Sequence, residues 1–216
     1  MIQTLYQKGW QVAIHANGDA AIEEVIASHI EVQKTHPSFD MRHQVIHAQT
    51  ASSYHLQSIL EHDLTPTFFS NHIKYWGDRH YEMFLGPKRA QRISPAKEAQ
   101  GIGLAYTLHT DTPINPFQLM HSVVERTTPK GRVLGKKLGI SRYQALYAIT
   151  HMAAWQVHLE HLVGSISPGK QADFVITDKN PLSVHTDLQD VQVLETYIAG
   201  KRVHAQGHTP DEKKAA

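Results

Sequence analysis

The sequence predicts an α/β fold in which helices cover a parallel β-sheet, and three observations support this. Short apolar, β-branched segments alternate with helix-like segments four times along the chain, an order typical of parallel sheets. Polar side chains follow the ends of three predicted strands, where α/β proteins place their functional groups. Hydrophobic residues make up 41% and charged residues 19% of the 216 residues, as in ordinary globular proteins.

The first elements follow simple patterns. Residues 10–15 (WQVAIH) and 43–47 (HQVIH) are short apolar runs and predict buried strands. Between them, residues 20–35 gather apolar side chains towards one face and predict a helix. A second helix is expected over 52–61, because two serines at its start can cap it.

The middle of the chain predicts a third strand at 64–70 (LTPTFFS) and a fourth at 104–109 (LAYTLH). Between these strands, residues 71–87 predict a long loop rich in aromatic and polar side chains. Residues 88–100 then predict a helix that Pro95 must kink or split in two.

The last part of the chain predicts two more helices and a small β segment. The helices are expected over 116–126 and 141–156, and strands over 172–177 (ADFVIT) and 193–199 (VLETYIA). A tight turn at Gly200 should lead into a further strand.

This order of elements divides the chain into three regions. We expect one α/β domain over 1–163, a β segment over 164–207, and a frayed polar tail over 208–216.

Composition narrows the function classes. The formal net charge is +1, so we expect no nucleic-acid partner. No apolar run approaches the length of a membrane span, and the start of the chain lacks the pattern of a signal peptide, so we expect a cytoplasmic protein. The absence of cysteine excludes disulfides and thiolate metal sites. The 17 histidines are the unusual feature, because imidazole is a common metal ligand.

Potential metal ligands and other polar groups gather at the predicted strand ends. They are His15, Asn17 and Asp19 after the first strand, His47 after the second, and His109 and Asp111 after the fourth. Two imidazoles with a carboxylate suit Zn²⁺ or Mn²⁺, and such a site can activate water for hydrolysis.

Each of these residues also has a purely structural interpretation. His15 and His47 could be hydrogen-bonded histidines at strand ends, while Asp19 and Asp111 could cap the helix or turn that follows them. Their recurrence at three strand ends favours a functional site.

Four segments resemble motifs of the YtcJ-like, N-substituted formamide deformylase-like branch of the amidohydrolase superfamily. Residues 15–22 (HANGDAAI) look like its HAxGDxAI signature, and residues 42–49 (RHQVIHAQ) resemble its second histidine motif. Residues 109–113 (HTDTP) resemble its catalytic aspartate motif, although His-Thr replaces the usual Gly-Ser or Asn before the aspartate. Residues 164–175 are similar to the segment where such chains return to a β-sandwich domain.

The resemblance implies a fold, a reaction and a site. The fold would be the C-terminal half of a (β/α)8 TIM barrel, about four βα units, plus part of a small β-sandwich. His15 and His47 would bind one metal, and Asp111 would bind a second metal or its water and act as the catalytic base. The cofactor would be a divalent metal, zinc first with manganese or iron as alternatives. The substrate would be a small-molecule amide, hydrolysed at a non-peptide C–N bond.

The predicted loop over 71–87 is a candidate substrate lid. From it we select His72, Trp76 and Asp78 as substrate-binding candidates, together with Asn17. The alternative is an exposed loop with some packed aromatic side chains.

The chain departs from the family in one major respect. The His-x-His motif of the first barrel strand and the bridging lysine or glutamate of the fourth have no counterpart here. Four βα units cannot close an eight-stranded barrel. We therefore expect a truncated or split gene, or a half-barrel completed by another chain or by a second copy of this one. Whether the chain is an enzyme, or a catalytically incomplete fragment with a regulatory or binding role, stays open.

Overall fold

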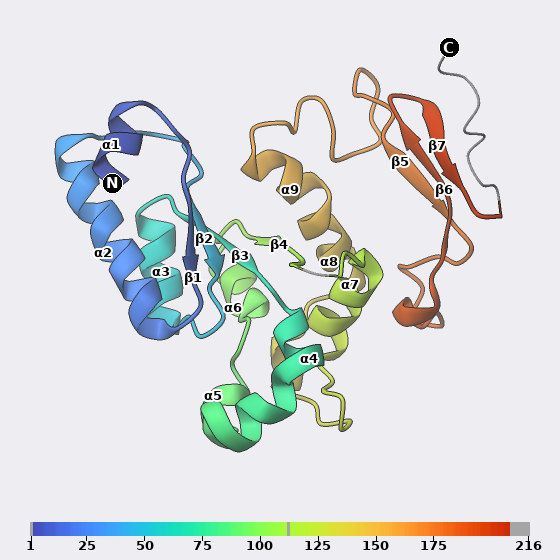
Figure 1. The fold of residues 1–216 in the computed structure, drawn as a ribbon, viewed down its shortest axis with the longest axis horizontal. Helices are drawn as coiled ribbons and strands as arrows, with labels where there is room; N and C mark the ends of the chain where they lie inside the picture. The colour runs from blue at the N-terminus through green and yellow to red at the C-terminus, as the bar shows by residue number, and fades with distance from the viewer. Residues whose placement is uncertain (1, 112, 208–216) are drawn as a thin grey trace, which may run out of the picture.

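The structure is a computed structural model that describes residues 2–111 and 113–207. Its centre is a sheet of four parallel strands in the order β1 (Ala13–Ala16), β2 (Gln44–His47), β3 (Thr65–Phe68) and β4 (Thr107–Leu108) (Figure 1). Residues Ala16, His47 and Phe68 are register partners on β1, β2 and β3. Because all strands run in the same direction, their carboxyl ends lie along one edge of the sheet.

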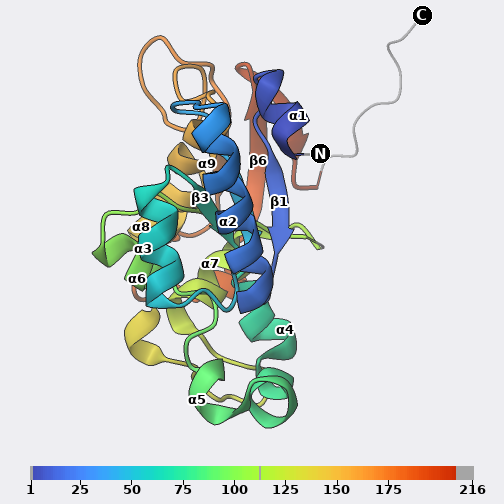
Figure 2. The ribbon, with the colours of Figure 1, turned by 90° about the vertical axis from the view of Figure 1, so that its left-hand side faces the viewer.

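Helices α2 (Asp19–Thr35) and α3 (Ser53–Glu61) lie side by side (Figure 2), with α2 against β1 and α3 against β3. They have the expected bounds to within a residue, and Ser52 caps α3 through a capping box. Their apolar faces join the strand side chains in the main core, which is completed by α6 (Ala96–Gly101), α7 (Pro116–Glu125) and α8 (Arg142–Ile149). The short helix α1 (Ile2–Gln7) packs on α2.

The segment expected to be a loop is helical, so that prediction was wrong. Residues 71–90 form α4 (Asn71–Arg79), a π-helix (His80–Phe84) and α5 (Gly86–Ala90), with α4 beneath the carboxyl ends of the strands in Figure 1. The buried side of α4 carries mostly polar side chains, so apolar periodicity could not reveal it. A small second core of Ile73, Ile93 and Leu134 holds this segment in place.

Two other expected helices are interrupted. The segment 88–100 splits into α5 and α6, with Pro95 at the start of α6. The segment 141–156 splits at Thr150 into α8 and α9 (His151–Gln156). Thr150 lies outside helical backbone geometry, and its hydroxyl donates to the carbonyl of Leu146. The fourth strand keeps only two residues in regular pairing, Thr107 and Leu108, opposite Thr67 and Phe68 of β3.

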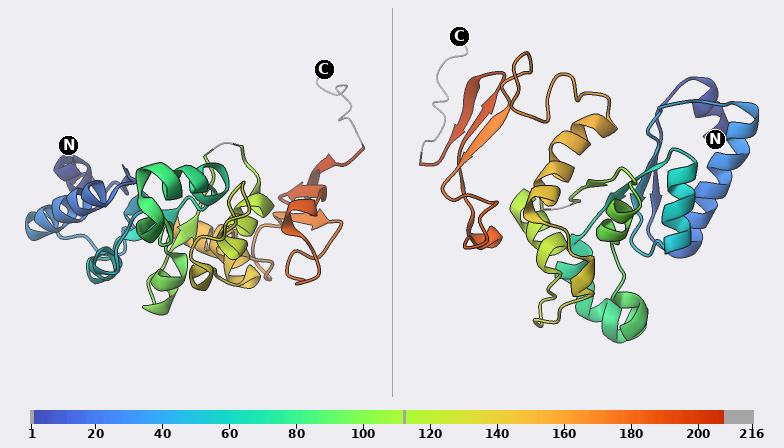
Figure 3. Two further views of the ribbon diagram at one scale, coloured as in Figure 1. Left: turned by 90° about the horizontal axis from the view of Figure 1, so that it is seen from below. Right: turned by 180° about the vertical axis from the view of Figure 1, so that it is seen from behind.

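The predicted C-terminal β segment is present. Strands β5 (Phe174–Thr177), β6 (Val193–Ile198) and β7 (Lys201–Ala205) form an antiparallel sheet, which lies at the opposite end of the molecule from α1 (Figure 3). Two short 3-10 helices, Lys136–Leu138 and Leu188–Asp190, complete the described elements. The predicted tail over 208–216 lies outside the described residues.

Candidate metal centre

Three side chains from two strand ends meet at the carboxyl edge of the sheet. His47 Nδ1 lies 3.2 Å from His109 Nε2, and His109 Nε2 lies 3.5 Å from Asp111 Oδ1. One potential ligand atom from each residue lies within 4.8 Å of the others. We call these three residues the His-His-Asp cluster. Their spacing lets one cation reach all three.

His47 is placed by an unusual backbone. Both His47 (φ 72°) and Ala48 (φ 45°) have left-handed conformations, which are costly for residues other than glycine. The Ala48 amide donates to the carbonyl of Ala16, at the end of the neighbouring strand, over 3.1 Å. Such strain persists where the surrounding structure enforces it, commonly at functional sites.

The His109 ring is held in place by contacts on the side that faces away from the cluster. Its Nδ1 lies 3.0 Å from the hydroxyl of Thr67 on β3, and its amide donates to Phe68 over 3.1 Å. A ring that donates from Nδ1 to Thr67 keeps the lone pair of Nε2 directed at His47 and Asp111. An outer hydrogen bond of this kind fixes the orientation of metal-binding histidines.

Burial keeps the two imidazoles neutral near pH 7. The pKa of His109 is lowered to about 4, chiefly by burial and in part by neighbouring His47, while the carboxylate of Asp111 opposes the shift. Burial also lowers the pKa of His47. Neutral imidazole is the form that binds metal. Two neutral imidazoles and one partly exposed carboxylate therefore fit a single divalent cation.

The other candidates from the first strand lie beside the cluster. The His15 ring packs edge-on against His47, with centroids 4.7 Å apart, but its nitrogens are outside the cluster. The Asn17 carbonyl accepts from Thr50, while Asn17 Oδ1 is buried without a hydrogen-bond partner. Asp19 starts α2 after Gly18, the N-cap, and accepts from the amide of Ala20. Asp19 is therefore the first residue of α2, and its side chain is not the helix cap that the structural interpretation expected.

The candidates on α4 separate into two groups. The His72 ring is 5.5 Å from His47 and 5.8 Å from Trp76, so His72 lies beside the cluster and Trp76 lies beside His72. The carboxylate of Asp78 is buried elsewhere and accepts from Thr128, over 2.8 Å, and from Arg132, over 2.7 Å. These contacts give Asp78 an anchoring role for α4, and its contact with a substrate stays a prediction.

Sequence reasoning named His109 at a strand end but gave it no role in the site, and it did not select two neighbours of the cluster, Phe69 and His80. His109 ends a strand like His15 and His47, but the family motif has a different residue there. Phe69 stacks on His109 with centroids 5.6 Å apart. His80 is 6.1 Å from His72, and its Nε2 lies 3.0 Å from the Gln49 amide. A histidine eight residues after His72 on one helical segment is a signal that could have identified His80.

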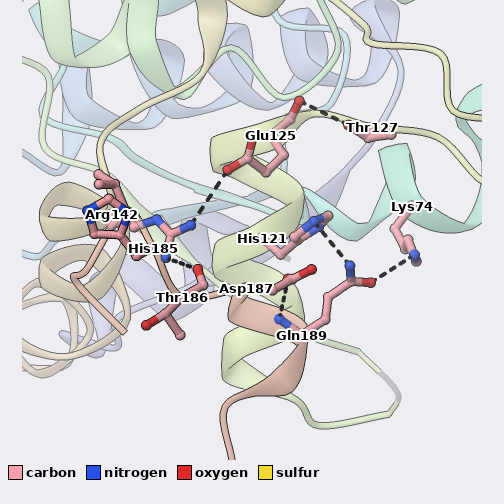
Figure 4. A pocket seen from close by; sticks show the side chains of 10 residues that line it. Lys74, His121, Glu125, Thr127, Arg142, His185, Thr186, Asp187 and Gln189 are labelled. Atoms are coloured by element: carbon pink, nitrogen blue, oxygen red, sulfur yellow. Dashed lines mark hydrogen bonds and ion pairs between the residues drawn. The ribbon is translucent and has the colours of Figure 1, made fainter. Parts of the chain in front are cut away.

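A separate polar cavity of about 440 Å³ lies between α4, α7 and the 184–189 segment (Figure 4). Its polar groups bind one another: Lys74 donates to Gln189 over 3.1 Å, and the Gln189 amide lies 3.2 Å from His121 Nε2. No member of the His-His-Asp cluster lines this cavity. The cluster is therefore the better candidate for chemistry.

The four parallel strands form an open sheet, and the histidine and carboxylate cluster lies at its carboxyl edge. This is where a metal-dependent hydrolase barrel is expected to place its active site. The sequence model of the amidohydrolase family matches residues 1–204, and the chain belongs to that family.

Among curated proteins, the chain is 31% identical to Protein LONG AFTER FAR-RED 3 of Arabidopsis thaliana, over 92% of this chain and 35% of that protein. It is 26% identical to the putative amidohydrolase YtcJ of Bacillus subtilis (94% and 39%). It is 25% identical to the N-substituted formamide deformylase of Arthrobacter pascens (89% and 36%). The predicted YtcJ-like branch is confirmed, and the chain spans between 35% and 39% of the length of these relatives.

Solved structures show the same fold. An uncharacterized metal-dependent hydrolase of Pyrococcus horikoshii OT3 matches with a TM-score of 0.70 at 20% identity, over 88% of this chain and 39% of that one. An amidohydrolase of Thermotoga maritima matches with a TM-score of 0.65 at 16% identity (94% and 46%). The prediction of part of a barrel plus a small β segment is confirmed. Within the described residues, no helix is long and apolar enough to span a membrane.

Proposed function

We propose that this chain provides the site for metal-dependent hydrolysis of a non-peptide C–N bond in a small-molecule amide. The observation that carries the proposal is the His-His-Asp cluster, whose ligand atoms lie within 4.8 Å of one another. His47, His109 and Asp111 would hold the cation, with zinc as the first candidate and manganese or iron as alternatives. When bound, such a cation supplies the Lewis acidity that makes water nucleophilic near neutral pH and polarises a carbonyl group.

We assign both proton transfers of the hydrolysis to Asp111. Its side chain is 54% exposed, so a water and a substrate can reach it. Amide hydrolysis needs a base to remove a proton from the attacking water and an acid to protonate the departing amine. One carboxylate at the cluster can do both in sequence. The deformylase relative acts, as its name states, on N-substituted formamides, which supports a C–N bond as the target.

The first test is metal binding. We expect the purified chain to retain about one equivalent of zinc or manganese after loading, measured by elemental analysis. His109→Ala should lower metal affinity by at least about tenfold, because it removes the central ligand. His121→Ala is the matched control, since His121 is a partly buried histidine outside the cluster. Less than about a tenth of an equivalent in the wild-type chain would overturn the enzymatic proposal.

The second candidate is a catalytically incomplete chain, or a half-barrel that needs a partner. Strands β1 and β4 each have one neighbour in the sheet, so each leaves an open edge. The name of the Arabidopsis relative does not describe an enzyme. A metal-loaded chain that releases no amine from a panel of N-substituted formamides would favour this candidate.

A further inference from the structure

The polar cavity of about 440 Å³ between α4, α7 and the 184–189 segment has charged side chains of both signs in its lining (Figure 4). Lys74 and Arg142 contribute positive charge, and Glu125 and Asp187 contribute negative charge, so these four charges cancel. All four act on the ring of His121, which burial keeps neutral near pH 7 by lowering its pKa. The volume is that of a small-molecule site. A ligand with separated charges and no net charge would match this lining.

The guanidinium of Arg142 is anchored at one end only. Its Nη1 donates to the carbonyls of Ser183 and Thr186, over 2.7 Å in each case, and the side chain is only 14% exposed. Nε and Nη2 form the other end, and neither makes a hydrogen bond to any residue that the structure describes. Paired N–H groups of this kind bind a carboxylate at two points. Arg142 therefore presents a rigid pair of donors to a ligand.

Glu125, at the end of α7, makes only a long contact with this donor pair. Its Oε1 lies 3.9 Å from Arg142 Nη2, beyond hydrogen-bond length, and its side chain is 47% exposed. A free α-amino acid carries a carboxylate and an ammonium on one carbon atom. With the carboxylate on the Arg142 donors and the ammonium on Glu125, two short ionic contacts would replace one long contact.

The side chain of Gln189 positions further polar groups in the cavity. Lys74 Nζ donates to Gln189 Oε1 over 3.1 Å, and the Gln189 amide nitrogen lies 3.2 Å from His121 Nε2. Asp187 Oδ1 accepts from the backbone amide of Gln189 over 2.9 Å. The Lys74 ammonium has further donors and the Asp187 carboxylate further acceptors. An uncharged amide on a ligand could accept from the first and donate to the second.

We propose that the polar cavity binds a free α-amino acid whose uncharged side chain both donates and accepts hydrogen bonds. Arg142 holds the α-carboxylate and Glu125 holds the α-ammonium, while Lys74 and Asp187 hydrogen-bond the side chain. No member of the His-His-Asp cluster lines this cavity. Binding therefore needs no metal, and it is independent of the hydrolysis proposed for the cluster.

Calorimetric titration of the full chain, without added metal, compares three probes. L-Glutamine has every group that the cavity would recognise, 4-aminobutanamide lacks its α-carboxylate, and glutaramate lacks its α-ammonium. We expect L-glutamine to bind saturably, and each analogue to bind at least about tenfold more weakly because it loses a charge-assisted contact. No saturable binding of L-glutamine, or equal binding of all three probes, would overturn the inference.

Two substitutions assign the contacts. Glu125→Gln should weaken L-glutamine binding by about tenfold without weakening glutaramate binding, because only L-glutamine has the ammonium. Arg142→Lys should weaken the binding of both and leave that of 4-aminobutanamide unchanged, because lysine keeps the charge but lacks the donor pair. Glu24→Gln is the control, since Glu24 is an exposed carboxylate on α2. A folding defect would weaken all probes alike, so the selective losses report recognition.

Glu125→Gln is the deciding variant, because an exposed, isosteric substitution leaves the fold intact. Unchanged L-glutamine affinity in Glu125→Gln would overturn the inference, whatever the result for Arg142→Lys. Loss of L-glutamine binding in His109→Ala, with Glu125→Gln unaffected, would place the ligand at the cluster and would also overturn it. Failure of the chain to take up metal would overturn the proposed function alone, because the cavity contains none of the cluster residues.

Discussion

The hydroxyl of Thr67 is a single group on which the geometry of the cluster depends. It lies 3.0 Å from His109 Nδ1 and is buried on β3. We expect Thr67→Val to weaken zinc binding by about tenfold, because the His109 ring loses the contact that orients it. Competition with a chelating dye measures the change. Thr65→Val is the control, since Thr65 is equally buried two residues earlier on β3. Equal affinities for the two variants would show that Thr67 does not orient His109.

Two histidines buried between α1, α2 and β2 make stability depend on pH. Tyr6 donates to His29 Nδ1 over 2.5 Å, and the amide of Val12 donates to His43 Nδ1 over 3.1 Å. Both rings are thus held neutral, and burial lowers the pKa of His43 to about 4 from its usual 6.5. The unfolded chain therefore binds more protons than the folded chain between these values.

Because the folded pKa of His43 is depressed, its contribution to stability is complete above pH 6.5 and declines towards pH 4. We expect the free energy of unfolding in urea to fall by about 1–3 kcal/mol over that window. In His43→Gln the same titration should have a shallower slope. An unchanged slope would assign the pH dependence to other groups.

At the residue scale, sequence reasoning placed His15, His47 and Asp111 at strand ends, and the structure brings His15 and Asp111 close to His47. It could not find the ligand geometry of His109, because that depends on a left-handed turn at His47 and on the hydroxyl of Thr67 from another strand. Neither feature leaves a local pattern.

Among the elements, α4 packs unusually close to the 126–134 segment. A methyl group at Gly77 would lie 2.6 Å from the Thr128 methyl, and the hydrogen bond to Asp78 holds Thr128 in place. Alanine normally stabilises a helix by about 1 kcal/mol over glycine. We expect Gly77→Ala instead to destabilise the protein by about 1–3 kcal/mol, because the helix must shift.

Thermal or urea unfolding measures the effect, and Gly101→Ala is the control. Gly101 is also helical, and nothing lies within 4 Å of an added methyl group there. A Gly77→Ala variant as stable as Gly101→Ala would show that α4 can move away from Thr128.

The elements that the sequence predicted well share one property. Helices α2 and α3 bury apolar faces against a sheet, so the helical period of their apolar residues appears in the sequence, and the capping serine of α3 appears there too. Helix α4 buries His72, Asn71 and Asp78. Its stability comes from contacts with residues some 50 positions later, such as Thr128, which no local pattern encodes.

For the whole molecule, the open edges at β1 and β4 leave backbone donors and acceptors unpaired within the sheet. We expect the isolated chain to associate, with the second copy or a complementary half-barrel covering these edges. Sedimentation across a range of protein concentrations should give a mass above 24.3 kDa. A monomer at every concentration, with a cooperative melt, would show that the half-barrel is stable by itself.

The π-helix at His80–Phe84 has a consequence for insertions and deletions. A π-helical turn holds one more residue than an α-helical turn, and each α-helical residue rotates the chain by about 100°. Removing one residue from 81–83 would restore continuous α-helix and shorten the spacing of His80 and Phe84 from four residues to three, which rotates Phe84 about the helix axis relative to His80. A one-residue deletion there should therefore be tolerated by the fold while changing the contact between the His80 and Phe84 rings. A change of length at this point would thus repack the surroundings of His80 with neither aromatic residue replaced.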